Sequence, residues 1–276
     1  MNAPEFIYTV LLKPKPLRSA ANACLRAILP ETIQRHNAVI HLNPKDPVVS
    51  GALALHQYEK AETRFFLSAC APGMTFLDIG ANVGYYSALA LARFKGNGSV
   101  IALEPDPDSF FYLQRTVAAN GKAACVQKAA SSYNGSTRLF LNTENKGDNR
   151  LYANDLATQE LEVSTVTVDQ LLTELQVSSV NLIKIDVQGH EGHVFRGMKQ
   201  TIRNSRQLTI LSEFWPDGLR QAGDDPLRVL NELEAMDLEL FELLPEGNTK
   251  RLESKEALIA RFPGRQYTNI VASKQR

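Results

Sequence analysis

Residues 76–87 of this 276-residue chain read FLDIGANVGYYS, and they constrain its fold more than any other segment. Residues 75–79 are mostly apolar and partly β-branched, which is typical of a strand buried on both faces of a sheet. Gly80 and Gly84 end this run, and residues 85–94 have the apolar spacing of a helix. The segment therefore predicts a strand, a tight glycine turn and a helix whose first amides point over the turn. A nucleotide-like ligand is the usual occupant of such a place.

Two acidic residues indicate which kind of nucleotide-like ligand the turn would bind. Asn82 stands where the dinucleotide fingerprint GxGxxG requires a glycine, so the chain does not match that fingerprint. Asp78, in the turn, would repel a pyrophosphate and attract an ammonium group. Glu104 ends the next predicted strand, where a carboxylate can accept hydrogen bonds from both ribose hydroxyls. Together the two acids favour S-adenosylmethionine, which carries an ammonium and a sulfonium but no phosphate; a purely structural glycine turn is the alternative.

Composition and charge agree with one large α/β domain plus an extension. Lys+Arg and Asp+Glu both number 30, and this neutrality favours a small-molecule or glycan substrate over a nucleic-acid partner. The three cysteines are widely spaced and lack metal-ligand spacing with a histidine, which indicates reduced thiols. No apolar run approaches the ~20 residues of a membrane helix, and the N-terminus has no signal-like apolar core. We therefore expect no transmembrane segment and a cytoplasmic location.

Predicted strands and helices alternate along most of the chain. Strands are predicted at 75–79, 99–103, 123–128, 180–186, 208–214, 238–244 and 267–273, and helices at 85–94, 107–119, 169–176, 191–203 and 225–236. This alternation predicts a mostly parallel sheet with helices on both faces. Residues 136–142 and 161–168 alternate apolar and polar side chains, which predicts a two-stranded insertion at about residues 132–168.

The first 55 residues are expected to form an N-terminal helical extension to the main domain, residues 56–276. Six prolines lie in the first 50 residues, and residues 17–29 have helical spacing in a locally basic context. This pattern favours a solvated capping helix, or a substrate region, over membrane contact. A further helix is predicted over residues 58–69, directly before the first strand.

Five stretches of the chain resemble the FkbM-type family of S-adenosylmethionine-dependent methyltransferases. In chain order they are FLDIGANVGYYS, ALEPDPDSF, GDNRLY, VSTVTVDQLL and IKIDVQGHEGHVFRGM, within about residues 56–215. The glycine turn is shared by many methyltransferases, whereas IDVQGHE is more particular to this family. The resemblance implies an α/β, Rossmann-like class I fold with a seven-stranded, mostly parallel sheet, its last strand antiparallel beside the fifth. It also implies O-methylation of a hydroxyl on a sugar, glycan or secondary metabolite.

The resemblance also implies which residues hold the cofactor. The methionine part of S-adenosylmethionine would be lined by Asp78, Gly80, Asn82 and Gly84. Asp78 would bind the ammonium group directly or through water, and Glu104 would accept hydrogen bonds from the ribose hydroxyls. Ala130 and Ser131 follow the third strand, where backbone amides and the Ser131 hydroxyl would read the adenine edge.

Methyl transfer is expected at the carboxyl end of the fourth predicted strand, because ligands of such sheets lie outside the carboxyl ends of the strands. Asp186 would face the methyl end of the cofactor, and His190 follows it at the start of a helix. An alcohol acceptor must lose its proton, and a neutral imidazole is a competent base near pH 7. His190 is therefore the predicted proton acceptor and Asp186 the residue that orients the hydroxyl. The alternative is that Asp186 is the base and His190 is structural.

Acceptor contacts are predicted on either side of this strand, at Asn149, Arg150, Glu213 and Trp215. Asn149 and Arg150 lie in the insertion, where a plain turn is the alternative. The Trp215 ring could stack on a sugar or simply cover the end of the sheet. Asp186 and Glu213 could pair to hold Mg²⁺ or Ca²⁺, but two oxygen donors are few for such an ion, so no metal is predicted.

Two other classes of function stay open. An NAD-type dinucleotide-binding oxidoreductase would also use Glu104, although the missing GxGxxG and the charge of Asp78 count against it. A non-catalytic module that keeps the methyltransferase fold is the second, and the intact Asp78, Gly80, Glu104 and Asp186 count against it.

Overall fold

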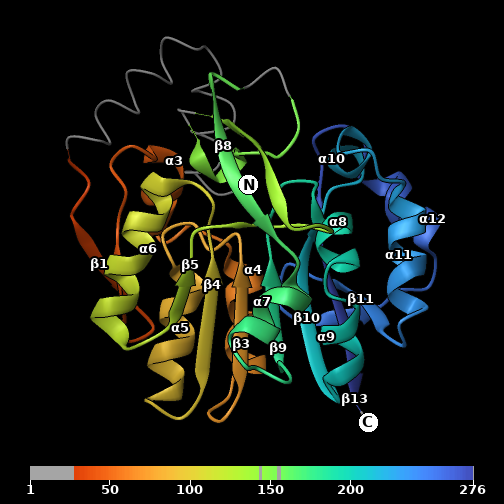
Figure 1. Cartoon of the computed structure of the whole chain (residues 1–276), viewed down its shortest axis with the longest axis horizontal. Coiled ribbons are helices and arrows are strands. Elements are labelled where there is room, and N and C mark those ends of the chain that lie inside the picture. Colours follow the sequence, from red (N-terminus) through yellow and green to blue (C-terminus); the bar gives the residue numbers. More distant parts are fainter. Residues whose placement is uncertain (1–27, 143–144, 154–156, 276) are drawn as a thin grey trace.

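The computed structural model describes residues 28–142, 145–153 and 157–275, which are built around an eight-stranded sheet (Figure 1). Along the sheet the strands are β12 (Thr249–Arg251), β11 (Glu239–Leu243), β13 (Thr268–Gln275), β10 (Gln207–Phe214), β9 (Leu182–Ile185), β3 (Thr75–Ile79), β4 (Ser99–Leu103) and β5 (Ala124–Val126). The seven predicted strands are confirmed, and β12 is an additional short strand. β13 runs antiparallel between β10 and β11, while β10, β9, β3, β4 and β5 are mutually parallel.

Both faces of the sheet are buried, which explains the near-continuous apolar strands in the sequence. Successive residues of β3 point to opposite faces, so Leu77 and Ile79 enter one apolar cluster and Phe76 enters the other. The first cluster includes side chains of α7 (Val168–Glu174), α8 (Glu191–Arg196), α9 (Lys199–Asn204), α10 (Pro216–Gln221), α11 (Pro226–Glu234) and α12 (Lys255–Arg261). The second includes side chains of α4 (Lys60–Ala69), α5 (Tyr85–Phe94) and α6 (Pro107–Asn120). Within the described ranges, no helix combines the length and apolarity needed to cross a membrane.

The single helix predicted over residues 191–203 is wrong, because the structure has α8 and α9 with a break at Gly197 and Met198. A side chain from α7 causes the break. Asp169 accepts hydrogen bonds from the Thr201 and Gln200 amides at 2.7 and 3.0 Å, so it caps α9 from outside its own segment. The helical period alone could not reveal this tertiary cap.

The N-terminal segment contains a hairpin and a short helix that were not predicted. β1 (Thr32–Arg35) and β2 (Ala38–His41) pair around a two-residue turn with positive φ, and α3 (Pro47–Ala54) begins at the cap Asp46. β2 and α3 contribute buried side chains to the cluster that contains α5 and α6. The helix predicted over residues 17–29 lies outside the described residues except at its last two positions, and the boundary near residue 55 stays a prediction.

The two strands predicted at 136–142 and 161–168 pair with each other in a small sheet. β7 (Gly135–Leu141) and β8 (Gln159–Val166) are antiparallel, and β6 (Ala129–Ala130) adds a parallel edge to β8. A short 3₁₀ helix, η2 (Lys146–Asp148), lies in the connection between β7 and β8. β8 and α3 are found at the same end of the central sheet, which is where the carboxyl ends of the parallel strands lie (Figure 1).

Candidate active site

A cavity of about 460 Å³ lies at the carboxyl ends of β3, β4, β9 and β10, between α3 and the insertion. Its wall includes Gly80, Glu104, Asp186 and Glu213, which end or follow these four strands. The volume is within the range of small-molecule sites, and the position is where open α/β sheets bind ligands. The residues predicted for the cofactor and for the acceptor therefore meet in one space, with the exceptions described below.

The two positions of the turn require glycine for different structural reasons. Gly80 has φ +79°, and a Cβ at this position would lie 1.9 Å from the carbonyl oxygen of Asp186. Only a glycine lets β3 turn this close to the end of β9. Gly84 has φ +84°, and its Cβ would lie 2.7 Å from the Leu113 side chain of α6. Gly84 therefore allows two helices to approach, and it lies outside the cavity wall rather than along a ligand.

Asp78 is buried behind the turn, not in the main cavity. Its carboxylate accepts hydrogen bonds from the Ser87 amide and hydroxyl at 3.0 and 2.7 Å, which fixes the first turn of α5 to β3. Burial raises the pKa of Asp78 to about 6, although the Ser87 hydrogen bonds and Lys184 favour the ionised form. The structure thus gives Asp78 a structural partner and does not bring it to the main cavity, where it was predicted to meet an ammonium group.

Glu104 lies in the cavity wall, and its carboxyl is held by the backbone. Oε2 accepts from the Asn82 amide at 2.8 Å and Oε1 from the Asp106 amide at 2.9 Å. Burial raises the pKa of Glu104 to about 8, against the effect of these two hydrogen bonds. Asn82 has φ +48°, and its buried Oδ1 has no hydrogen-bond partner among the described residues. This corner of the cavity therefore offers fixed acceptors to a ligand that donates hydrogen bonds.

Asp186 and Glu213 lie in the cavity wall and are bridged by Gln188. The Gln188 amide nitrogen donates to Asp186 Oδ1 at 2.8 Å and to Glu213 Oε2 at 3.3 Å. Burial, followed by the nearby charge of Asp186, raises the pKa of Glu213 well above its ordinary value. Gln188 thus fixes both carboxyls in the cavity wall, with its shorter hydrogen bond to Asp186.

A buried lysine, which was not predicted from the sequence, supports this pair. The Lys184 ammonium lies 3.5 Å from Asp186 Oδ2 and 4.0 Å from Glu59 Oε2, with its side chain only 3% exposed. Burial alone would lower the pKa of Lys184, but Asp186, Glu59 and Glu213 together raise it above its ordinary value. The signal was a lysine in the middle of a strand predicted to be buried on both faces.

His190 does not line the cavity, contrary to what its predicted role as the base requires. Its Nε2 lies 3.1 Å from the Ser131 hydroxyl, and its ring stacks on His193 with centroids 4.2 Å apart. Burial and the neighbouring His193 lower the pKa of His190 to about 3, so the ring is neutral. The cause is the backbone at Gly189, whose φ of +97° places the turn tightly against Gly218. His190 directly precedes α8, and its ring contacts Ser131 and His193 rather than the cavity.

The contact with His190 also keeps the Ser131 hydroxyl out of the cavity, where it was predicted to bind the adenine edge. The Ser131 side chain is fully buried against His190, whereas its neighbours Ala129 and Ala130 do line the cavity. Glu191 also has a structural place, because its Oε1 accepts from the Val187 and Gly189 amides, both at 3.2 Å. These contacts hold the loop that carries Gln188 into the cavity.

The predicted acceptor residues converge on one side of the cavity. Asn149, Arg150, Glu213 and Trp215 all line it, although they come from the insertion and from the end of β10. The Arg150 guanidinium lies 4.5 Å from the Trp215 ring centroid, and its Nε donates to Asp148 at 2.9 Å. The Trp215 ring is fixed by a hydrogen bond from Nε1 to the Gly264 carbonyl at 2.7 Å. Among the residues with described positions, no group of three or more His, Cys, Asp or Glu side chains could hold a metal ion.

The strand order, with an antiparallel β13 between β10 and β11, and the cavity beside the glycine turn define a Rossmann-like class I methyltransferase fold. The chain belongs to the FkbM methyltransferase family, since the sequence profile described as Methyltransferase FkbM domain matches residues 78–240. This membership counts against the dinucleotide-binding oxidoreductase.

Several known proteins are similar to this chain. Hexuronic acid methyltransferase AglP of Haloferax volcanii is 24% identical over 153 residues, which are 53% of this chain and 59% of that protein. 2-O-methyltransferase NoeI of Sinorhizobium fredii is 27% identical over 192 residues, 63% of this chain and 75% of that protein. The chain thus spans well under the full length of both relatives. A solved TehB-like SAM-dependent methyltransferase from Corynebacterium glutamicum has a TM-score of 0.45 and 13% identity, covering 82% of this chain and 93% of that one.

Proposed function

We propose that the chain is an S-adenosylmethionine-dependent methyltransferase that methylates a hydroxyl group of a sugar, glycan or secondary metabolite. The observation that carries this proposal is a single cavity with Glu104 at one end and the Asp186–Glu213 pair at the other. Membership of the FkbM family supports the reaction class. The names of two relatives, a hexuronic acid methyltransferase and a 2-O-methyltransferase, support a carbohydrate hydroxyl as the acceptor. The balanced charge of the chain supports a small-molecule or glycan partner over nucleic acid.

The corner around Glu104 fits the cofactor. When bound, S-adenosylmethionine supplies a methyl group on a positively charged sulfur, which is already a good leaving group. Glu104 would accept hydrogen bonds from the two ribose hydroxyls. Two backbone amides already fix its carboxyl in the cavity wall for this contact. Ala130 would lie at the adenine, and Gly80 would leave room beside the methionine part.

We assign the role of base to Asp186 rather than to His190. The Asp186 carboxyl lines the cavity, is oriented by Gln188, and lies beside Glu213, whose pKa burial raises well above its ordinary value. The neutral His190 ring faces Ser131 instead. A positioned base contributes roughly 10²–10⁴-fold, and alignment of the hydroxyl with the methyl group contributes further. Lys184, 3.5 Å behind Asp186, would stabilise the ionised carboxyl that accepts the proton.

The acceptor would lie between Asp186 and the insertion. The Arg150 guanidinium lies over the Trp215 indole there, so a polar group borders an aromatic ring, and Asn149 lies in the same wall. Aromatic faces bind the apolar face of a sugar ring, while the polar groups at the edge can bind its hydroxyls. No step of this proposal needs a metal ion.

The test compares Asp186→Asn with His190→Ala in an assay of S-adenosylhomocysteine release, using uronic acids, hexoses and their glycans as acceptors. Asp186→Asn should lower kcat by roughly 10²-fold or more and remove the acid limb of the pH–rate profile. Its affinity for S-adenosylhomocysteine should stay within threefold of wild type, an order-of-magnitude margin for a residue that contacts mainly the acceptor. His190→Ala should keep most of its kcat.

Two outcomes would contradict the proposal at different points. Wild-type protein that does not bind S-adenosylhomocysteine in calorimetry would return the chain to the class of non-catalytic modules. An inactive His190→Ala together with an active Asp186→Asn would restore His190 as the base, which was the prediction from sequence.

A further inference from the structure

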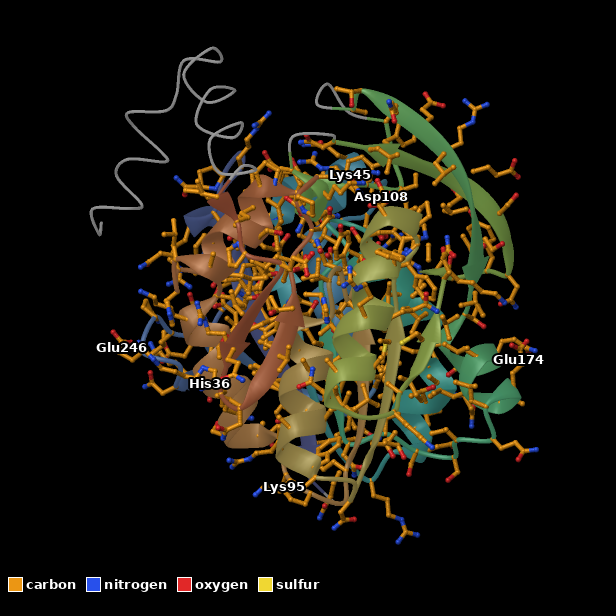
Figure 2. All side chains as sticks on the ribbon, turned by 90° about the vertical axis from the view of Figure 1, so that its left-hand side faces the viewer. His36, Lys45, Lys95, Asp108, Glu174 and Glu246 are labelled. Atoms are coloured by element: carbon orange, nitrogen blue, oxygen red, sulfur yellow. The ribbon has the colours of Figure 1, made fainter. Side chains whose placement is uncertain are left out.

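A second pocket, of about 160 Å³, lies between the hairpin of β1 and β2, the end of α3 and one face of α4. Its lining includes five basic side chains, those of Arg35, His36, His56, Lys60 and Arg64. Within the described ranges, its lining contains no Asp or Glu. Figure 2 shows His36 at the edge of the molecule, on the side where the hairpin lies. We call this space the basic pocket, and its composition indicates a site for an anion.

The permanently charged groups of the basic pocket have only neutral partners. Arg35 donates to the two last carbonyls of α3 at 2.9 and 3.0 Å, and Lys60 donates to a side-chain amide oxygen at 2.8 Å. Arg64 donates to the backbone carbonyl of Glu246 at 3.3 Å. Among the described residues, none of these three cations forms an ion pair with a carboxylate. Like charges close together repel each other, so an anion bound between them would be stabilised.

The inner wall of the basic pocket is apolar. Leu53 and Tyr85 are buried there, and Leu67 is partly buried against the same hydrophobic cluster. The Tyr85 ring is held in place, because its hydroxyl lies 3.1 Å from the Thr63 hydroxyl. An aromatic and aliphatic wall beneath cationic groups suits a ligand with an apolar body and an anionic edge. A sugar unit that carries an acidic group has this character, whereas a bare inorganic ion does not use the apolar wall.

The basic pocket lies next to the main cavity. Tyr58 lines both spaces, so one aromatic side chain separates them. On the other side of Tyr58, the main cavity is lined by the carboxyl groups of Glu59, Asp186 and Glu213. An anionic group on the acceptor would be repelled by these carboxyls and attracted by the basic pocket. An acceptor hydroxyl at Asp186 and an anionic group beyond Tyr58 can therefore belong to one molecule.

We propose that the basic pocket binds the anionic group of a sugar unit next to the unit that is methylated, so that the acceptor is an acidic glycan. The inference rests on the proposed function and names the substrate class of that function. Guanidinium groups bind carboxylate, phosphate or sulfate oxygens through charge-assisted hydrogen bonds, and Arg35 and Arg64 supply two of them. Lys60 adds a third positive charge at the start of α4.

The test measures binding by calorimetry on the full chain with S-adenosylhomocysteine present. The probes are two matched pairs, trigalacturonate with its uncharged methyl ester and phosphorylated maltotriose with maltotriose. Wild type should bind at least one charged probe about fivefold more tightly than its uncharged partner. Lys60→Ala and Arg64→Ala should each weaken the charged probe by about twofold to fivefold, the effect of an ion pair that stays partly exposed. Affinity for the uncharged probes should not change.

Further variants separate a specific pocket from general charge. Lys60→Glu combined with Arg64→Glu should abolish the preference for the charged probe. Arg64→Lys keeps the charge but loses the planar fork, so it should lose less affinity than Arg64→Ala. Lys199→Ala is the matched control, because Lys199 is an exposed cation on α9, which packs on the other face of the sheet. Lys199→Ala should leave every affinity unchanged.

Several outcomes would overturn the proposal. Equal affinity of wild type for the charged and uncharged probes would show that the basic pocket does not recognise an acidic sugar. An equal loss in Lys199→Ala would show that overall charge, not the pocket, attracts the probe. Binding to phosphatidylglycerol vesicles that Lys60→Glu with Arg64→Glu abolishes, without binding of either charged probe, would assign the pocket to a membrane surface.

The proposed function is tested separately by the cofactor. Every variant of the basic pocket should bind S-adenosylhomocysteine within about twofold of wild type, because these residues do not contact the cofactor. If wild type does not bind S-adenosylhomocysteine, the proposed function fails, whatever the preference between the probes. If it binds S-adenosylhomocysteine but shows no preference for a charged probe, only the acidic acceptor is refuted.

Discussion

Gly80→Ala tests the geometry at the centre of the site, and Gly73→Ala is its matched control. Both glycines have a left-handed backbone, with φ +79° and +88°, so alanine is strained at either position by about 1–2 kcal/mol. At Gly73 the new methyl group would have no neighbour within 4 Å. At Gly80 it would lie 1.9 Å from the Asp186 carbonyl oxygen, whereas ordinary contact begins at 3.4 Å. The turn and the end of β9 must therefore separate by roughly 1.5 Å, the difference between these two distances.

This separation has a calculable consequence. It strains the hydrogen bonds from the Asp186 amide to the Ile79 carbonyl and from the Gly80 amide to the Leu103 carbonyl, both 3.0 Å long. Losing each costs about 0.5–1.5 kcal/mol, and overpacking costs typically about 1–3 kcal/mol. Together with the backbone strain, Gly80→Ala should thus lower the free energy of unfolding by about 3–8 kcal/mol, against about 1–2 kcal/mol for Gly73→Ala.

Urea denaturation gives the two free energies, and calorimetry with S-adenosylhomocysteine gives the effect on the site. Gly80→Ala should lose most of its affinity and activity, because the same shift moves Asp186 and the cofactor turn apart. Gly73→Ala should keep both. Equal destabilisation of the two variants, within about 0.5 kcal/mol, would show that the close approach of the turn to β9 is not what requires a glycine.

Three further outcomes are expected. Glu104→Ala should weaken S-adenosylhomocysteine binding by about 1.5–3 kcal/mol in calorimetry, the scale of hydrogen bonds to a charged group; unchanged affinity would remove Glu104 from the ribose. His190 is neutral in the folded protein because burial lowers its pKa to about 3, so its contribution to stability is present above about pH 6.5 and is lost as pH falls toward 3. Between pH 7 and 4.5, the free energy of unfolding of the wild type, measured by urea titration, should fall by about 2–3 kcal/mol more than that of His190→Asn. Identical decreases for the two proteins would refute a buried neutral ring. EDTA should change methyltransferase activity little, and a large loss reversed by Mg²⁺ or Ca²⁺ would show that Asp186 and Glu213 do bind a metal.

The sheet could be predicted from the sequence because each core strand carries its own signal. A strand buried on both faces must be a short apolar run, and the connecting helices have a distinct period. The hairpin of β1 and β2 was missed because four-residue strands are too short to show a period, although the Asn37 turn was a usable signal. The break between α8 and α9 depends on Asp169 from another helix, so no local pattern contains it.

The candidate site was predictable to the level of which strand ends meet, but not to the level of which side chains enter the cavity. Asp186, Glu104 and Glu213 follow parallel strands, so topology alone brings them together. His190 follows a turn whose direction depends on the left-handed conformations of Gln188 and Gly189. A residue after such a turn can face either way, and the chain gives no periodic signal that decides between them.

The charge balance of the cavity gives a physical reason for a cationic cofactor. Lys184 is surrounded by Asp186, Glu59 and Glu213, which all raise its pKa, so one buried ammonium is shared among three carboxyl groups. Burial raises the pKa of both Glu59 and Glu213, and the nearby charge of Asp186 raises both further, against the lowering effect of Lys184. A ligand that brings a sulfonium and an ammonium would offset this deficit and favour the ionised carboxyls. Binding the cofactor would then balance the negative charge that the carboxyl groups around Lys184 bring to this end of the sheet.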